Sequence, residues 1–195
     1  MRKLLILFLF ILSSSGIAQI NLKNPTAISL NGGFFMPYSS ETFKTGVNIG
    51  FDIQHKIDPI YAFLNLTYNI SSRNNKVPSE SYNNTSSTGL LEVSIGPRLY
   101  IGRTSLEYFI DGGLGMYLEQ KGSYDIKING VTTSHPSESN MSLGGNIGVG
   151  GEFPITDDLD FVGRAKYHLY FGVGDAPFLN TYFGILGGIK YNIKF

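Results

Sequence analysis

The feature that most constrains the fold is a two-residue alternation of apolar and polar side chains, clearest at the C-terminus. From Phe183 to Phe195 every second residue is aromatic, Ile or Gly, and the residues between them include Lys190, Asn192 and Lys194. Successive side chains of a β-strand point to opposite faces. The segment therefore predicts a strand with one apolar face and one polar face.

The same alternation recurs along the rest of the chain at strand-like lengths. The eight segments predicted as strands are 28–36, 43–54, 60–70, 91–101, 106–119, 140–153, 160–171 and 182–195. After Gln19 no apolar run is long enough to cross a membrane as a helix. The pattern predicts an all-β chain.

The connections between these segments alternate in length. Short turns with Pro, Gly or Asp are predicted at 56–59, 102–104 and 154–158. Longer polar connections lie at 37–42, 72–87, 121–139 and 172–180. Bacterial outer-membrane barrels place short turns at the periplasm and long loops outside the cell. The sequence therefore predicts an eight-stranded antiparallel up-and-down transmembrane β-barrel with both ends of the strand series at the periplasm.

The sense of the alternation separates a membrane barrel from a soluble one. In a soluble lipocalin-like barrel or β-sandwich, which is the alternative, the apolar faces form the core. Here the apolar faces carry no Lys, Arg, Asp or Glu within any predicted strand, and such a charge would cost about 2–4 kcal/mol at mid-membrane. The polar faces combine many glycines with large tyrosines, which suits the narrow interior of a small barrel. Apolar faces toward lipid are therefore favoured.

The first 18 residues have the three parts of a secretory signal peptide. A basic start at Arg2 and Lys3 precedes an apolar run, and small residues follow, with Gly16 and Ala18 at the positions that a signal peptidase prefers. We expect residues 1–18 to be cleaved and residues 19–195 to form the outer-membrane barrel domain.

Overall charge and cysteine content exclude several function classes. The chain has 15 Lys and Arg against 15 Asp and Glu, so a nucleic-acid-binding protein, which needs a basic face, is not expected. It has no Cys, which excludes disulfides, thiolate metal sites and a Cys nucleophile.

The charged residues of the polar faces are expected to form a structural network inside the barrel. Charges of both signs in a lumen satisfy each other, whereas an unpaired one is costly. The predicted members are Glu92, Arg98, Glu107, Asp111, Glu152, Arg164, Lys166 and Lys190. Among the histidines, His135 has Ser and Glu neighbours in sequence without the geometry of a catalytic site, and His168 is expected inside near the outer rim. No catalytic, cofactor-binding or metal site is predicted, and the chain is not expected to be an enzyme.

The stretch Gly187–Phe195 and, more weakly, the runs Gly96–Tyr100 and 150–154 resemble the small outer-membrane β-barrel family, the type that includes OmpX and the barrel domain of OmpA. The likeness covers residues 19–195. It implies a place in the bacterial outer membrane in contact with lipid. It also implies that Tyr191, Ile193 and Phe195 form the assembly signal read by the barrel-assembly machinery during insertion.

Long loops on a rigid scaffold are where recognition usually occurs. We therefore expect a structural, adhesive or surface-recognition function, with a possible surface ligand bound through loops 72–87 and 121–139. The alternative is a narrow channel or conduit for small molecules across the outer membrane, since an interior of eight strands is nearly filled by side chains.

Overall fold

The structure is a computed structural model that describes residues 25–37, 44–72, 81–83, 86–101, 106–128, 130–172 and 179–193. Among these residues, no helix is long and apolar enough to cross a membrane. The predicted signal peptide, the turn at 102–104 and Phe195 lie outside the described residues.

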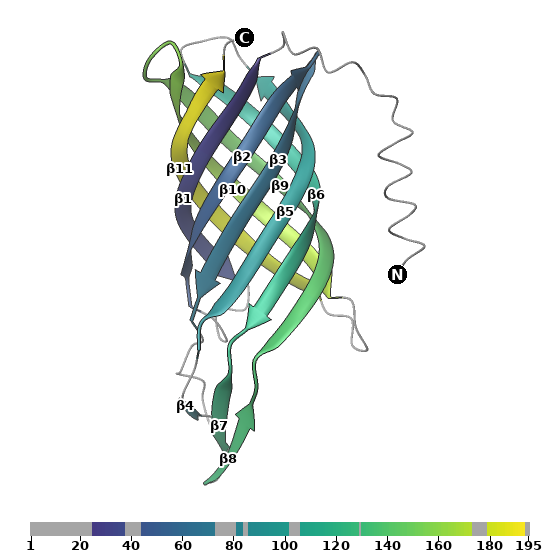
Figure 1. The fold of residues 1–195 in the computed structure, drawn as a ribbon, viewed down its shortest axis with the longest axis vertical. Helices are drawn as coiled ribbons and strands as arrows, with labels where there is room; N and C mark the ends of the chain where they lie inside the picture. The colour runs from purple at the N-terminus through teal and green to yellow at the C-terminus, as the bar shows by residue number, and fades with distance from the viewer. Residues whose placement is uncertain are drawn as a thin grey trace, which may run out of the picture.

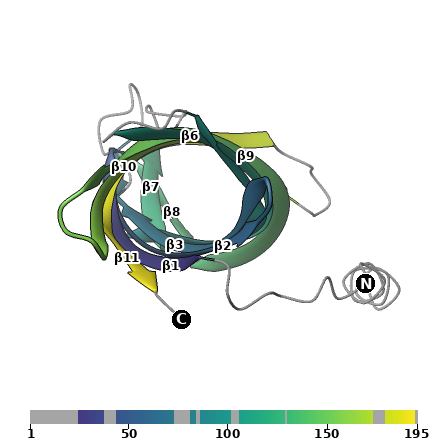
Figure 2. The ribbon, with the colours of Figure 1, turned by 90° about the horizontal axis from the view of Figure 1, so that it is seen from above.

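Eight antiparallel strands close a barrel, as the alternation predicts (Figures 1 and 2). They are β1 (Thr26–Pro37), β2 (Gly46–Ile57), β3 (Ile60–Ser71), β5 (Thr88–Ile101), β6 (Glu107–Lys121), β9 (Glu138–Pro154), β10 (Leu159–Gly172) and β11 (Leu179–Ile193). Each strand pairs with the barrel strands before and after it in the chain, and β1 pairs with β11 to close the ring. The closing register runs from Thr26↔Ile193 to Pro37↔Tyr182. Closure removes the unpaired edges that an open sheet would expose.

Three further strands form a separate sheet that projects from one end of the barrel (Figure 1). They are β4 (Ser81–Asn83), β7 (Tyr124–Ile128) and β8 (Val131–His135), in the order β4-β7-β8. We call them the projecting sheet, and the end of the barrel that bears it the outer end. These strands lie within segments 72–87 and 121–139, for which the prediction of polar loops is wrong in part. Both faces of β8 are largely exposed, so its sequence carries no apolar alternation to read.

Side chains alternate across the barrel wall in the predicted sense. Outward side chains of the strands are apolar and exposed, with Leu114 76% and Ile147 60% accessible. Inward positions such as Asp52, Asn65 and Glu92 are at most 2% accessible. Soluble proteins rarely expose so continuous an apolar surface, whereas a barrel in lipid requires it.

Four glycines form a row across the outside of the barrel that the sequence did not predict. Gly151 lies opposite Gly163, Gly163 opposite Gly187, and Gly187 opposite Gly32, so the row crosses β9, β10, β11 and β1. Alternation places all four outward. The ring of Phe161 covers part of the row, 3.8 Å from where a Cβ of Gly163 would lie and 3.6 Å from that of Gly187. An aromatic ring that covers glycines on its own strand and on the next one replaces some of the packing they lack.

Candidate functional site

At mid-barrel, a buried arginine ties three strands together. Arg98 on β5 is 1% exposed, and its Nη2 lies 2.8 Å from Asp111 Oδ2 on β6 and 3.1 Å from Asp52 Oδ2 on β2. Its Nη1 also donates to Gln54 Oε1 at 2.6 Å. The guanidinium carbon lies 4.3 Å from the centre of the Phe109 ring. Two carboxylates and an aromatic face thus compensate for the loss of water around this charge.

Two further cations on β10 complete the centre of the lumen. Arg164 Nη1 lies 3.4 Å from Asp52 Oδ2, and Lys166 Nζ lies 5.1 Å from the centre of the Phe63 ring. Lys166 Nζ and two nitrogens of Arg164 have no hydrogen-bond partner among the described residues. In a polar lumen, ordered water is the usual partner of such groups.

Toward the outer end, Glu92 accepts bonds from several strands. Ser94 Oγ donates to its Oε1 at 2.7 Å and Asn146 Nδ2 at 2.9 Å. Tyr182 Oη donates to Oε2 at 2.7 Å, and His168 Nδ1 lies 3.2 Å from the same oxygen. His168 is thus buried inside near the outer rim, in the predicted place, as part of a polar cluster.

At the inner end, Lys190 of β11 forms an ion pair and a hydrogen bond with Glu152 of β9. Lys190 Nζ also lies 2.9 Å from Asp160 Oδ2. Tyr100 Oη donates to Glu152 Oε1 at 2.7 Å. Of the eight residues predicted as the interior network, seven are buried and Glu107 is exposed at the inner rim.

The network also contains residues that the predicted set omits. Asp52, Gln54 and Asp160 contact its arginines and lysine, and Tyr182 contacts Glu92. Asp52 and Asp160 stand on the predicted polar faces, so the two-residue alternation could have identified them as inward-facing charges.

A layer of buried apolar and aromatic side chains covers Glu92 on its outer side. Its members are Phe35, Leu90, Tyr117, Tyr170 and Tyr182. The rings of Tyr117 and Tyr170 are stacked with centres 4.9 Å apart, and the edge of one ring in the Phe35–Tyr182 pair faces the other at the same distance. Ring against ring packing of this kind fixes the side chains in place.

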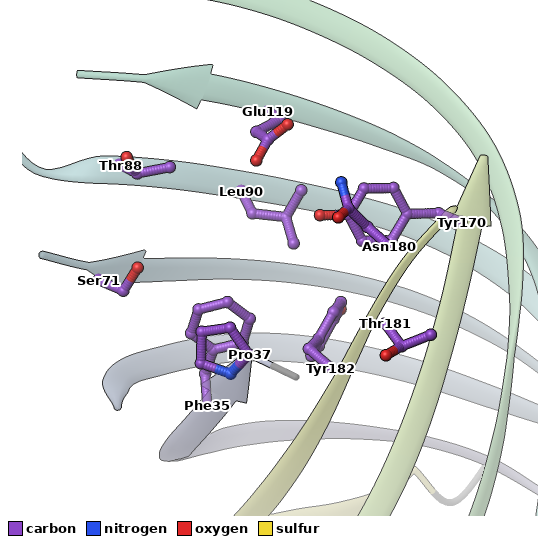
Figure 3. A pocket seen from close by; sticks show the side chains of 10 residues that line it. All are labelled: Phe35, Pro37, Ser71, Thr88, Leu90, Glu119, Tyr170, Asn180, Thr181 and Tyr182. Carbon is purple, nitrogen blue, oxygen red and sulfur yellow. The ribbon is translucent and has the colours of Figure 1, made fainter. Parts of the chain in front are cut away.

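Two small cavities lie at opposite ends of the lumen. The outer cavity, of about 50 Å³, is bounded by residues of β1, β3, β5, β6, β10 and β11 (Figure 3). The inner cavity, of about 150 Å³, lies beside Tyr100, Asp160 and Lys190. Between them lie the ion pairs of Arg98 and the hydrogen bonds of Glu92, whose side chains are buried. The described side chains thus fill the centre of the barrel.

The remaining histidines have structural surroundings. His135 at the end of β8 stacks on Tyr124, with ring centres 4.7 Å apart, and His55 Nδ1 lies 2.7 Å from Thr26 Oγ1. Within the described ranges, no three His, Cys, Asp or Glu side chains form a group that could hold a metal ion.

Comparison with known proteins points to one architecture. The family model described as outer membrane protein beta-barrel domain matches residues 4–192. Comparison with curated protein sequences found no match.

Three similar solved structures cover nearly the whole barrel. Neisserial surface protein A (NspA) is 12% identical with a TM-score of 0.53, covering 85% of this chain and 96% of that one. The N-terminal β-barrel domain of Pseudomonas aeruginosa OprF is 12% identical with a TM-score of 0.51, covering 88% and 98%. A major outer membrane protein from Thermus thermophilus is 10% identical with a TM-score of 0.54, covering 87% and 99%. At these identities the likeness shows the fold.

Proposed function

The chain belongs to the outer membrane protein beta-barrel domain family and lies in the bacterial outer membrane, and from this premise we propose that it is a surface-recognition protein without enzymatic activity. Its outer end then faces the outside of the cell and its inner end the periplasm. The projecting sheet is the element that we assign to recognition.

The observation that carries this proposal is the ordered projection beyond the barrel. β6 and β9 remain paired as far as Lys121 and Glu138, and β7 and β8 continue outward as a hairpin beside β4. This sheet pairs only within itself among the described residues, so it adds nothing to barrel closure. β8 lies at its edge, with Val131 68% exposed. An exposed edge presents unpaired backbone donors and acceptors to a binding partner.

The filled lumen argues against the alternative, a narrow channel. Arg98 and its two carboxylates occupy the centre of the barrel. The Glu92 cluster and the aromatic layer lie between this centre and the outer end. A small molecule crossing along the axis would have to break several buried ion pairs. The cost of separating such a pair is several kcal/mol.

We also propose that the last strand carries the assembly signal. Tyr191 is exposed on the outward face of β11, and alternation places Ile193 on the same face, where a lipid-embedded assembly machinery could read them. Phe195, the third predicted member, lies outside the described residues.

The test of recognition removes the hairpin and keeps the barrel. Because Lys121 and Glu138 are directly opposite each other, residues 122–137 can be replaced by a two-residue Asn-Gly turn. Bacteria that express the full chain are expected to aggregate or to attach to surfaces coated with protein or glycan, and bacteria with the shortened chain are not. Both proteins should show the same heat-dependent gel mobility.

Attachment that persists without residues 122–137, or no attachment by the full chain, would contradict the proposal. A planar-bilayer recording provides the second readout. We expect no steady conductance from the full chain, and a steady open level would favour the channel instead.

A further inference from the structure

An incompletely paired carboxylate lies in the outer cavity. Glu119 on β6 is 6% exposed, and its Oε2 has no hydrogen-bond partner among the described residues. Among the described residues, the cationic atom nearest to Oε2 is Lys121 Nζ at 3.9 Å, which is longer than a hydrogen bond. By contrast, Glu92 deeper in the lumen has four polar neighbours. A buried carboxylate oxygen without a hydrogen bond is costly, so Glu119 Oε2 is poised to accept a cation.

The rest of the cavity suits a cation with an apolar stem. Glu119 extends from β6 toward the side chains of Phe35, Leu90, Tyr170 and Tyr182, which provide apolar and aromatic walls (Figure 3). Aromatic faces attract cations, most strongly where water is excluded.

These walls are held in place before any ligand binds. Tyr170 stacks on Tyr117, and Tyr182 stacks on His168 with ring centres 4.0 Å apart. The hydroxyl of Tyr182 is already bonded to Glu92, which leaves its ring as the surface presented to the cavity. Binding to such a fixed site costs little ordering of side chains.

We propose that this cavity binds the ammonium head of a primary alkylamine, with the Glu119 carboxylate as its counter-ion. A calcium ion needs about six to eight oxygen ligands, usually with several carboxylates among them. The cavity has one carboxylate beside the neutral polar side chains of Ser71, Thr88, Asn180 and Thr181. A neutral ligand would leave the charge uncompensated, and an anion would be repelled by it. The volume of about 50 Å³ admits an ammonium group with its first methylenes, so a longer chain must extend outward.

Such a head group has two sources, a free alkylamine or a lysine side chain of a peptide. The cavity is formed by barrel strands and not by the projecting sheet. The proposal is therefore independent of the recognition function assigned to that sheet. A chain that lacks residues 122–137 should still bind an amine, so failure of one proposal is distinguishable from failure of the other.

The first experiment is an NMR titration of the full chain in lipid nanodiscs with n-butylammonium. We expect saturable shifts of the backbone amides of Leu90, Glu119 and Thr181, and no saturable shifts with n-butanol, which has the same stem without the charge. Nα-acetyl-lysine methylamide, compared with its Nε-acetylated form, shows whether a lysine side chain is also accepted. No saturable shift with n-butylammonium overturns the proposal.

Variants then test the role of the carboxylate. Glu119→Gln should weaken binding about tenfold or more, since a hydrogen bond to a charged group is lost, whereas Glu107→Gln, the same change at the opposite rim, should leave it unchanged. Lys121→Gln should tighten binding severalfold, because it removes the cation of the chain that competes for Glu119. Equal affinity in the wild type and Glu119→Gln contradicts the assignment.

A second pair of variants covers the case in which Glu119→Gln does not fold. Tyr170→Phe keeps the aromatic wall and should retain the affinity within about twofold, and Tyr170→Leu removes the wall and should weaken binding by about 1 kcal/mol or roughly fivefold. Equal binding by these two variants would contradict an aromatic contribution. Heat-dependent gel mobility identifies which variants are folded.

Discussion

Arg98 is the residue on which the polar interior most depends. It connects β5 to β2 and β6 through Asp52 and Asp111, and it lies against the ring of Phe109. Its guanidinium cannot lose its proton under ordinary conditions. If Arg98 is removed, Asp111 loses its ion pair and Asp52 keeps only Arg164, in a place that water reaches poorly.

Arg98→Ala should lower the free energy of unfolding by about 3–5 kcal/mol, the usual cost of breaking a buried ion pair from one side. Urea unfolding of the barrel in lipid vesicles measures this change. The double variant Arg98→Met, Asp111→Asn removes one charge of each sign, leaves Asp52 its ion pair with Arg164, and should recover most of the loss. A loss below about 1 kcal/mol for Arg98→Ala would show that the pairs contribute little, as surface pairs do.

Glycines on the two faces of the wall should respond to the same substitution in opposite ways. A Cβ at Gly163, in the outward row, would meet only the ring of Phe161 at ordinary contact distance. A Cβ at Gly96, which faces inward, would collide with the backbone of Gly112 and Gly113 on β6.

Gly163→Ala should therefore stabilise the barrel by about 0.5–1 kcal/mol, because alanine restricts the unfolded chain more than glycine does. Gly96→Ala should destabilise it by about 1–3 kcal/mol through overpacking. The same unfolding assay in vesicles compares them. Equal effects of the two changes would contradict the assignment of the outward and inward faces.

At the scale of the element, β9 and the strand that precedes it in the chain, β8, lie in different environments. β9 lies in the barrel wall, where Ile147 is 60% exposed. β8 belongs to the projecting sheet, where Thr132 is also exposed. Both side chains are exposed on the surface of the protein. Their surroundings differ, since Ile147 faces lipid and Thr132 faces water.

Ile147→Arg should cost about 2–4 kcal/mol of stability or prevent insertion, because a charge at mid-membrane has no water around it. Thr132→Arg, the matched change in the projecting sheet, should stay within about 0.5 kcal/mol of the wild type. Unfolding in vesicles and yield of the membrane fraction measure both. A tolerated Arg at position 147 would place that face in water.

The projecting sheet shows where alternation fails as a predictor of strands. A strand with one face in lipid and one in the lumen must alternate, and the barrel strands do. β8 has both faces in water, so polar residues suit either side and its sequence looks like that of a loop. Its pairing with β7, through Tyr124↔His135 to Ile128↔Val131, is a consequence of the adjacent hairpin turn.

At the scale of the whole molecule, closure makes the barrel one cooperative unit. Every barrel strand is paired on both sides, including β1 and β11 across the closing register. Local opening therefore has to break pairing on two sides of a strand at once. Such a structure should resist detergent at ordinary temperature.

The protein from the membrane fraction should migrate differently on a dodecyl sulfate gel when it is loaded unheated and when it is boiled. The unheated form keeps the compact barrel, and boiling unfolds it. The gel shift measures this directly, with Ile147→Arg as a variant expected to show less of the folded band. No shift, with the protein in the soluble fraction, would contradict the membrane orientation of the apolar faces.

The sequence alone determined the barrel strands, their number and which face of each meets lipid. These properties follow from local physics, because the extended backbone of a strand sets the two-residue period and a charge in lipid is too costly to occur by chance. The interior position of seven of the eight network residues also follows from that period. Glu107 also stands at an inward position of the alternation, but it is exposed because it is the first residue of β6, at the rim.

Which interior residues meet was decided by the tertiary structure. Arg98 donates a hydrogen bond to Asp52, which is 46 residues away in the chain. Tyr182 donates one to Glu92 across a separation of 90 residues. The glycine row likewise exists because the registers of four strands bring Gly151, Gly163, Gly187 and Gly32 to one level. Alternation shows which face of the wall a side chain is on, but not its position along the barrel axis. That position depends on the stagger between strands, which is fixed only when all eight strands form the closed barrel.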